Sequence, residues 1–179
     1  MTERLPIIGV MGSGSEPHAR RAIPLGRWLA ALGAHVLTGG GGGVMTSVSR
    51  AFFESPKRRG LVIGVLPGGP ADDTGYPNRW VELPLRTHLP LTGGQGMDAM
   101  SRNHINVLSS DVVVALPGGD GTSSEVRLAV AYGRPVVAYL DSRDQIPDLP
   151  VDVELGRDLE DVQSFVLAHL ERLDRSVGG

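Results

Sequence analysis

The sequence predicts an α/β protein with a Rossmann-like, doubly wound parallel sheet, folded as a single domain over residues 1–179. Short β-rich runs alternate along it with longer stretches of helical period, which is the pattern of a sheet built from βαβ units. Glycines cluster directly after several apolar runs, where the strands of such a sheet turn into helices. A length of 179 residues suffices for one hydrophobic core of ordinary size.

The first third of the chain is expected to form three strands and two helices. We assign the strands to residues 7–11, 35–38 and 61–66 and the helices to residues 20–32 and 44–53. In the first helix Ala22, Leu25 and Leu29 recur at three- and four-residue spacings, which places them on one face. Pro24 is expected in the first turn of this helix or at a kink, because proline lacks a backbone N–H.

Residues 70–96 are rich in proline and glycine and are expected to form an irregular flank of the site, with one short strand near residues 80–83. Regular elements resume beyond this flank. We expect helices at residues 97–108, 123–132 and 159–173 and strands at residues 111–116 and 136–140. One sheet therefore accounts for the whole chain.

Composition excludes several classes of function. The sequence has no cysteine, which excludes disulfides, thiolate zinc sites and cysteine nucleophiles and suits a reducing compartment. No apolar run is long enough to span a bilayer and the N-terminus lacks a signal-peptide pattern, so we expect a cytoplasmic protein without membrane contact. A net charge of −3 argues against nucleic acid as a partner. The histidines show no ligand spacing with one another, so no metal site is expected.

Three strands end in glycine-rich turns that we expect to form one ligand pocket. The carboxyl ends of parallel strands meet at one edge of a sheet, and the helices that follow offer unpaired N–H groups and a positive dipole end to a phosphate. The expected lining residues are Gly12 and Ser13 after the first strand, Gly39, Gly40, Gly41, Gly42 and Gly43 after the second, and Gly118, Gly119, Asp120, Gly121 and Thr122 after residues 111–116. The partner predicted from this pattern is a small molecule that carries a phosphate.

Neither common phosphate-binding fingerprint matches these turns. A Walker loop needs Gly-Lys-Ser or Gly-Lys-Thr, and no lysine follows any of the glycines. The dinucleotide pattern is incomplete at the first turn, where Gly12 and Gly14 are present but the third glycine is not. A hydride-transferring enzyme is therefore not expected.

The most specific stretch of the sequence runs from Arg102 to Glu125. Arg102 lies on an expected helix, Asp111 opens the next strand, and residues 117–125 read Pro-Gly-Gly-Asp-Gly-Thr-Ser-Ser-Glu. This stretch resembles the LOG-like nucleotide-binding superfamily, whose members carry Pro-Gly-Gly-x-Gly-Thr-x-x-Glu after an arginine-bearing helix. Similar motifs occur at residues 12–13, 38–45 and 63–67, so that the resemblance covers residues 7–140.

The resemblance implies a homodimeric Rossmann-like protein, and under the hydrolase prediction we expect no cofactor. Its best-known branch, the cytokinin riboside 5'-monophosphate phosphoribohydrolases, hydrolyses the N-glycosidic bond of nucleoside 5'-monophosphates, AMP being one example, to free base and ribose 5-phosphate. The catalytic pair of that branch falls here on Arg102 and Glu125. A carboxylate stabilises the oxocarbenium character that develops on the ribose and orients a water, and a guanidinium holds the phosphate or the departing base. Apolar residues on more than one face of the helices at 97–108 and 123–132 also favour a dimer.

A second branch of the superfamily is an alternative. The cytokinin-activating branch has Arg-Lys after a His-Glu pair, whereas residues 101–104 read Ser-Arg-Asn-His, and residues 93–96 and 106–111 are more similar to the branch that contains the molybdenum-cofactor carriers. A carrier holds the phosphate of a pterin cofactor without chemistry, so molybdenum cofactor is the ligand expected under this alternative. The sequence departs from the carriers in keeping residues 117–119 and the full Gly-Thr-x-x-Glu.

Glu125 and Arg102 also have purely structural interpretations. The run from Thr122 to Glu125 fits a capping box, in which the glutamate accepts a hydrogen bond from the threonine backbone N–H. Arg102 fits an ordinary surface position on a helix. Because the two residues occur together at the family's spacing, we expect both to act in the pocket. The predicted function is nucleotide hydrolysis, with cofactor carriage as the alternative.

Overall fold

The described part of the chain forms a sheet of seven parallel strands in the order β4-β3-β2-β1-β5-β6-β7. The computed structural model describes residues 4–69 and 76–177. The strands are β1 (Ile7–Met11), β2 (His35–Thr38), β3 (Val62–Leu66), β4 (Leu83–Arg86), β5 (Val112–Ala115), β6 (Val136–Tyr139) and β7 (Glu154–Gly156). The α-helices are α1 (Ala19–Leu32), α2 (Gly43–Phe53), α3 (Asn103–Leu108), α4 (Asp120–Ala131) and α5 (Leu159–Val177), and the short 3-10 helices are η1 (Gly93–Gln95) and η2 (Arg143–Gln145).

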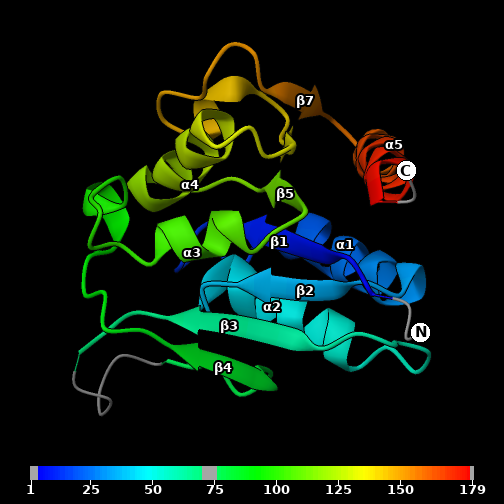
Figure 1. Cartoon of the computed structure of the whole chain (residues 1–179), viewed down its shortest axis with the longest axis horizontal. Coiled ribbons are helices and arrows are strands. Elements are labelled where there is room, and N and C mark those ends of the chain that lie inside the picture. The colour runs from blue at the N-terminus through cyan, green and yellow to red at the C-terminus, as the bar shows by residue number, and fades with distance from the viewer. Residues whose placement is uncertain (1–3, 70–75, 178–179) are drawn as a thin grey trace.

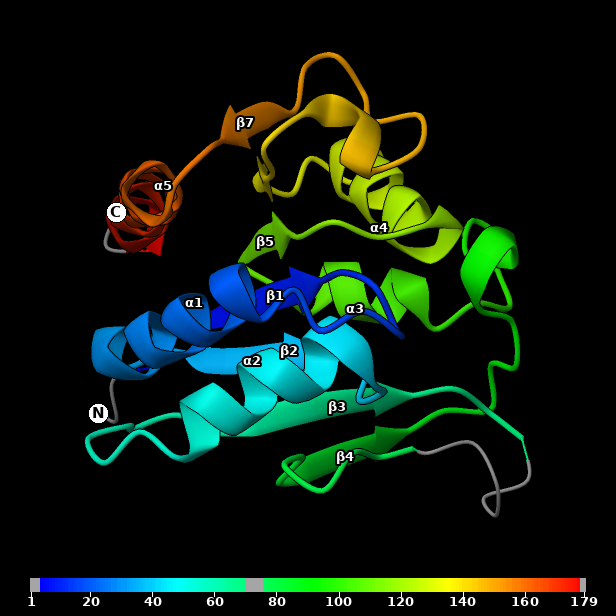
Figure 2. The same cartoon turned by 180° about the vertical axis from the view of Figure 1, so that it is seen from behind.

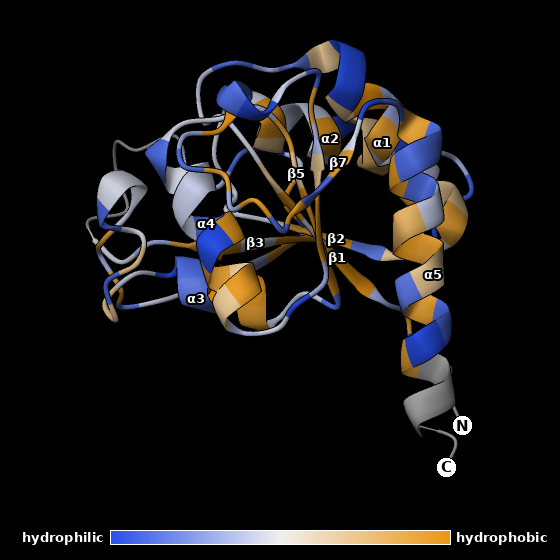
Figure 3. Cartoon of the chain, turned by 90° about the horizontal axis from the view of Figure 1, so that it is seen from above, coloured by the Kyte–Doolittle hydropathy of each residue, from blue (hydrophilic) through white to orange (hydrophobic). Residues whose placement is uncertain are grey.

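Helices cover both faces of this sheet (Figure 1), and Figure 3 shows α1, α2 and α5 on one side of it and α3 and α4 on the other. Successive residues of a strand point to opposite faces, so each central strand contributes to two cores. In β5, Val112 and Val114 belong to the core under α1, α2 and α5, whereas Val113 and Ala115 belong to the core under α3 and α4. The predicted doubly wound α/β fold is thereby confirmed.

The two helices α1 and α2 lie side by side in front of the sheet in Figure 2. They approach closely because Gly26 of α1 has no side chain, and a Cβ there would lie 2.6 Å from the backbone oxygen of Val48 in α2. Leu25 and Leu29 of α1 and Phe52 of α2 are fully buried beside this contact. The pair is thus fixed against β1 and β2, and with it the position at which α2 begins.

The strand order reverses beside β1, which pairs with β2 on one side and with β5 on the other. The chain runs outward from β1 to β4 and then returns to β5, and in an open parallel sheet ligands bind at the carboxyl ends of the strands beside such a switch point. The two turns that meet there are joined by a 3.0 Å hydrogen bond, in which the Ser13 N–H donates to the Pro117 carbonyl. The fold therefore brings the first and third glycine-rich turns together at one place.

The segment before α3 differs from the expected helix at residues 97–108, because α3 begins at Asn103 and is preceded by turns. Asp98 Oδ1 accepts a hydrogen bond from the Met100 N–H at 2.8 Å, and Ser101 Oγ accepts one from the Asn103 N–H at 3.2 Å. Side chains that bond nearby backbone groups in this way compete with helix formation. The helix prediction is therefore wrong for residues 97–102, and Arg102 is the N-cap of α3.

Three further boundaries also differ. The strand expected near residues 80–83 lies at Leu83–Arg86, because Asn78 accepts hydrogen bonds from the N–H groups of Trp80 and Val81 and closes a turn. Helix α4 begins at Asp120 rather than at residue 123. Pro24 is the sixth residue of α1, beyond its first turn. Strand β7, which we did not predict, has three residues and is too short to produce a periodic pattern.

Candidate functional site

A cavity of about 430 Å³ lies at the switch point of the sheet. Its wall combines the carboxyl ends of β1 and β2, the start of α4 and two segments from the irregular middle of the chain. This volume falls in the range of small-molecule sites, roughly 300–1,000 Å³. The lining residues are Val10, Met11, Gly12, Ser13, Gly14, Ser15, Gly39, Met45, Tyr76, Thr92, Gly93, Arg102, Asn103, Gly119, Gly121, Thr122 and Glu125.

The turn after β1 lines the cavity with Gly12 and Ser13, both of which the sequence predicts there. Gly12 packs against α2, since a Cβ at this position would lie 2.9 Å from the Val44 methyl carbons. The Ser13 carbonyl accepts a 2.9 Å hydrogen bond from the Val44 N–H, which ties the start of α2 to the turn. Ser13 Oγ accepts another from the Glu16 N–H at 2.9 Å. The loop is therefore shaped by its own backbone contacts.

Of the glycine run after β2, Gly39 lines the cavity, whereas Gly40, Gly41, Gly42 and Gly43 are not among the lining residues. Gly42 is the N-cap of α2 and Gly43 its first residue, with a φ of 56°. A Cβ on Gly43 would overlap the Ser13 carbonyl oxygen, so glycine is needed for this close approach. The run thus serves mainly to bring α2 up to the β1 turn, and Gly39 leaves space for the side chain of Arg102.

The turn after β5 contributes Gly119, Gly121 and Thr122 to the cavity wall, whereas Gly118 and Asp120 are not among the lining residues. Gly119 is the N-cap of α4, a helix of 12 residues, so the unpaired N–H groups of its first turn lie at the cavity. The Gly118 N–H donates to the Gln145 carbonyl at 3.1 Å.

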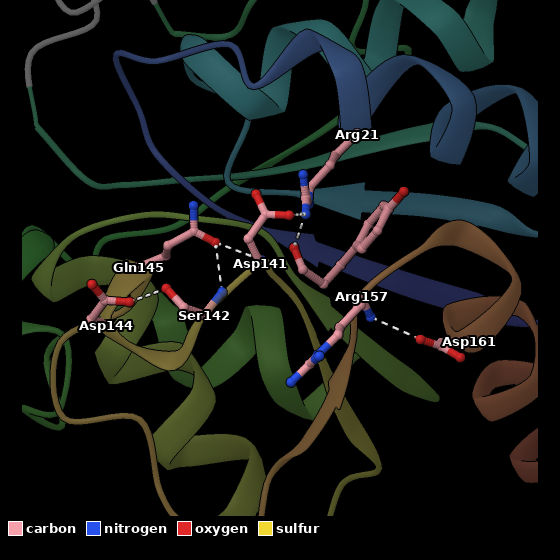
Figure 4. Close-up of polar contacts among 8 residues, drawn as sticks. Arg21, Asp141, Ser142, Asp144, Gln145, Arg157 and Asp161 are labelled. Carbon is pink, nitrogen blue, oxygen red and sulfur yellow. Dashed lines mark hydrogen bonds and ion pairs between the residues drawn. The ribbon is translucent and has the colours of Figure 1, made fainter.

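The loop that supports this turn follows β6. Figure 4 shows the Gln145 side-chain oxygen accepting hydrogen bonds from the backbone N–H groups of Asp141 and Ser142, at 2.7 and 3.4 Å. The Asp141 carboxylate pairs with Arg21 of α1 at 2.7 Å. The Gln145 carbonyl that receives the Gly118 N–H is therefore held by a loop that is itself anchored to α1.

Arg102 lies in the cavity wall and is almost fully buried, at 5% exposure. It packs on Gly39, where a Cβ would lie 2.5 Å from Nη1, and beside the Tyr76 ring, whose centroid is 5.8 Å from Cζ. Among the described residues, Nε and Nη1 have no hydrogen-bond partner. Buried polar groups are nearly always paired, and a guanidinium matches the oxygens of a phosphate or carboxylate. An anion at this position would complete the arrangement.

Glu125 faces the same cavity from α4 and is 8% exposed. Its Oε1 accepts a 2.8 Å hydrogen bond from Asn106 Nδ2. Burial raises the pKa of this carboxyl, while the positive charge of Arg102 and the hydrogen bond from Asn106 act in the opposite direction. The capping-box interpretation is wrong, because Glu125 is the sixth residue of α4 and no side chain in the described part of the chain caps that helix. A buried carboxyl with a raised pKa in a cavity is a candidate for acid–base chemistry.

Tyr76 is the lining residue that is hardest to predict from the sequence. It lies in the irregular stretch at residues 70–96, where no periodic pattern exists. Asn78 places it, since its N–H donates to the Gly40 carbonyl at 2.7 Å and its Nδ2 to the Gly41 carbonyl at 2.9 Å. Asn103, also unpredicted, comes directly after Arg102 and could have been found from that neighbour.

Two negative findings apply to residues 4–69 and 76–177. They contain no group of three or more histidine, aspartate and glutamate side chains placed to hold a metal ion. None of their helices is long and apolar enough to cross a membrane. Fold and cavity together define a Rossmann-like α/β protein with a cavity at its switch point, which is lined by a buried arginine and a buried glutamate.

Within this class, the chain belongs to the SLOG cluster4 family, whose sequence model matches residues 5–163. This confirms the LOG-like resemblance inferred from residues 117–125. The structure is similar to that of a molybdenum cofactor binding protein from Rippkaea orientalis, with 32% identity, a TM-score of 0.75 and coverage of 94% of this chain and 99% of that one. The molybdenum cofactor carrier protein from Chlamydomonas reinhardtii is similar too, with 33% identity, a TM-score of 0.73 and the same coverage. An uncharacterized protein of Archaeoglobus fulgidus is 30% identical over 137 residues, which is 75% of this chain and 80% of that protein.

Proposed function

We propose that this protein binds a phosphate-bearing small molecule in the switch-point cavity, and that it carries molybdenum cofactor, the ligand named for two of its relatives. The observation that carries the proposal is the Arg102 guanidinium, buried in the cavity wall with Nε and Nη1 unpaired among the described residues. Buried guanidinium nitrogens without hydrogen-bond acceptors lower stability, and a bound phosphate supplies the missing acceptors together with negative charge.

The surroundings of Arg102 support the same ligand class. The first turn of α4 presents backbone N–H groups and a positive dipole end at the cavity, which favours an anion. Tyr76 adds an aromatic ring to the wall, against which a flat heterocycle such as a pterin would pack. Coverage of 94% of this chain and 99% of each of these two relatives means that the likeness extends over the whole fold and not merely the glycine turns.

The test is anaerobic loading of the purified protein with molybdenum cofactor, followed by gel filtration and measurement of retained molybdenum and pterin. Wild type is expected to retain both in equal amounts. Arg102→Met should weaken binding by about ten- to a hundredfold, because a hydrogen bond to a charged group contributes about 1.5–3 kcal/mol. Arg172→Met, which removes an exposed arginine of α5, is the matched control and should bind as wild type does. Wild type that retains no pterin would refute carriage.

Hydrolysis of a nucleoside 5'-monophosphate is the second candidate function, and Glu125 is the observation that favours it. A carrier has no need of a buried carboxyl beside the bound phosphate, yet Glu125 shares the cavity with Arg102. In this reaction the C1'–N bond breaks, water adds its oxygen to C1', and one water proton goes to the departing base. Ionised Glu125 would stabilise the oxocarbenium character on the ribose and orient the water, while Arg102 holds the phosphate.

The hydrolase is tested by the release of adenine and ribose 5-phosphate from AMP, and of base from a panel of other monophosphates. Glu125→Gln should keep phosphate binding nearly intact and lower turnover by about a hundredfold or more, the scale of losing a positioned acid–base group. Arg102→Ala should weaken both binding and turnover. Glu154→Gln, at an exposed position on β7, is the control. An active Glu125→Gln enzyme would show that Glu125 is not part of the mechanism. A wild type that releases no base would refute the hydrolase, and cofactor carriage would remain as the proposed function.

A further inference from the structure

Asn106 lies one helical turn after Arg102 on α3, directly behind the Glu125 carboxyl. Its side chain is fully buried and is not among the residues that line the cavity. Asn106 Nδ2 donates to Glu125 Oε1 at 2.8 Å, whereas Asn106 Oδ1 has no hydrogen-bond partner among the described residues. The side-chain amide therefore lies outside the cavity wall, and its hydrogen bond to Glu125 is the one that it makes among the described residues.

Packing alone does not explain a buried asparagine at this position. A buried carbonyl oxygen without a donor lowers stability, and an apolar side chain of similar volume would avoid that loss. The backbone does not require asparagine either, since the Asn106 N–H donates to the Arg102 carbonyl and its own carbonyl accepts from Ser110 Oγ, bonds that any residue could make. What asparagine adds is the donor to Glu125.

We propose that Asn106 is a positioning residue, which fixes the Glu125 carboxyl at the cavity and keeps its ionised form accessible when Arg102 is engaged by a ligand. This inference rests on the proposed site, and it assigns a role to a residue that touches neither ligand nor solvent. Among the described residues, the charged group that acts on Glu125 is Arg102, at the N-cap of α3. A phosphate bound to that guanidinium offsets its positive charge and so weakens its stabilisation of the ionised Glu125 carboxylate. The hydrogen bond from Asn106 still stabilises the carboxylate, because the ligand does not bind Asn106.

An amide suits both charge states of the carboxyl. In the structure Nδ2 donates to Glu125 Oε1, the contact that suits an ionised carboxylate, and rotation of the amide by half a turn would let Oδ1 accept a hydrogen bond from a neutral Glu125. Because a hydrogen bond to a charged acceptor is about twice as strong as a neutral one, the net effect of Asn106 is to lower the pKa of Glu125.

The experiment is a titration of the Glu125 carboxyl by ¹³C NMR in protein labelled at glutamate, with the signal assigned by its loss in Glu125→Gln. Asn106→Leu removes the donor, and the titration midpoint of Glu125 is expected to rise by about one pH unit or more relative to wild type. The same difference is expected in saturating inorganic phosphate. Asn106→Asp keeps the shape of the side chain but adds a second carboxylate, and it should raise the midpoint further.

Ser49→Ala is the matched control, because Ser49 Oγ is another buried atom without a partner among the described residues, on α2. It should leave the Glu125 midpoint where it is in wild type, even if stability changes. A midpoint equal in wild type, Asn106→Leu and Asn106→Asp overturns the proposal. Since the titration needs no ligand, a protein that shows the shift but neither retains cofactor nor cleaves AMP would refute the proposed function while supporting the role of Asn106.

Discussion

Arg102 and Glu125 are charged residues that the fold buries almost completely, at 5% and 8% exposure. Burial leaves two nitrogens of Arg102 unpaired among the described residues, and it raises the pKa of Glu125. Such groups lower the stability of a folded chain, and at binding sites this is a common compromise with function. Removing either charge should therefore cost function and not stability.

Glu125→Gln is expected to change how stability depends on pH. With its pKa raised in the folded state, Glu125 binds a proton more tightly when folded than when unfolded, so the stability of wild type falls as pH rises from the ordinary glutamate range through the raised value. Glutamine does not titrate and escapes this loss. The free energy of unfolding, measured by denaturant titration from about pH 4 to about pH 8, should therefore favour the variant increasingly as pH rises.

The exposed Glu154→Gln serves as the control for that series and should parallel wild type throughout. If Glu125→Gln loses the same free energy as wild type across the range, the folded pKa of Glu125 is not raised, and the electrostatic account of the cavity fails.

Gly39→Ala tests whether the glycine exists to seat Arg102. A Cβ at this position would lie 2.5 Å from Arg102 Nη1 and 2.6 Å from Nη2, so the guanidinium must move away from the wall. We expect phosphate binding to weaken by about tenfold or more, the scale of losing one charge-assisted hydrogen bond. Gly94→Ala is the control, since a Cβ there meets Asp120 at an ordinary 3.6 Å. Equal binding by both variants would contradict the packing of Arg102 on Gly39.

At the scale of elements, the sequence predicts what depends on local pattern and fails where distant residues decide. The strands at 7–11 and 35–38 and the start of α1 follow from apolar runs and helical spacing, and they agree with the structure within a residue. The helix expected at 97–108 fails because Asp98 and Ser101 bond their own backbone neighbours and Leu91 pairs with Ser101. The bridge to Leu91 is invisible in a local pattern.

The candidate site shows the same division. Gly12, Ser13, Gly39, Gly119, Gly121 and Thr122 lie in the cavity wall with Arg102 and Glu125, as glycine turns and a family motif indicate. Tyr76 escapes prediction because its place depends on two hydrogen bonds from Asn78 to the glycine run nearly forty residues earlier in the chain. Asn106, the hydrogen-bond partner of Glu125, is likewise brought to it by the packing of α3 on α4, and no spacing in the sequence indicates this contact.

Asn78→Ala is expected to loosen the segment that carries Tyr76. The change removes the Nδ2 donor to the Gly41 carbonyl and the Oδ1 acceptor for the Trp80 N–H, each worth about 1 kcal/mol. Hydrogen exchange should become faster at residues 76–81 and stay unchanged in β1 and β5. Arg79→Ala, an exposed change in the same segment, controls for the loss of a side chain there. Unaltered exchange in Asn78→Ala would show that other contacts hold Tyr76 in place.

At the scale of the whole molecule, the homodimer predicted from the sequence has a candidate interface on the α3–α4 side. Exposed apolar residues gather on these helices and the turns before them, namely Met97, Met100, Leu108, Val130 and Tyr132. Leu108→Glu should convert a dimer to a monomer in light scattering at micromolar concentration, since a buried unpaired charge opposes association. Leu167→Glu is the matched control on α5, because Leu167 is 42% exposed and Leu108 45%.

A wild-type protein that is monomeric under these conditions would refute the dimer itself. Dissociation by Leu167→Glu but not by Leu108→Glu would instead place the interface on the opposite face of the sheet.

The cavity wall draws on residues from position 10 to position 125 and on both halves of the sheet beside the switch point. No single βαβ unit contains the site, so it exists only while these distant parts are assembled. A molecule that binds there consequently stabilises the entire fold, and it raises the free energy of unfolding by about 2.7 kcal/mol at a concentration of about a hundred times its Kd. Thermal denaturation can therefore identify the ligand, because phosphate monoesters, pterins and nucleotides can be ranked by the rise in Tm that each produces. In Arg102→Met these differences in Tm should disappear.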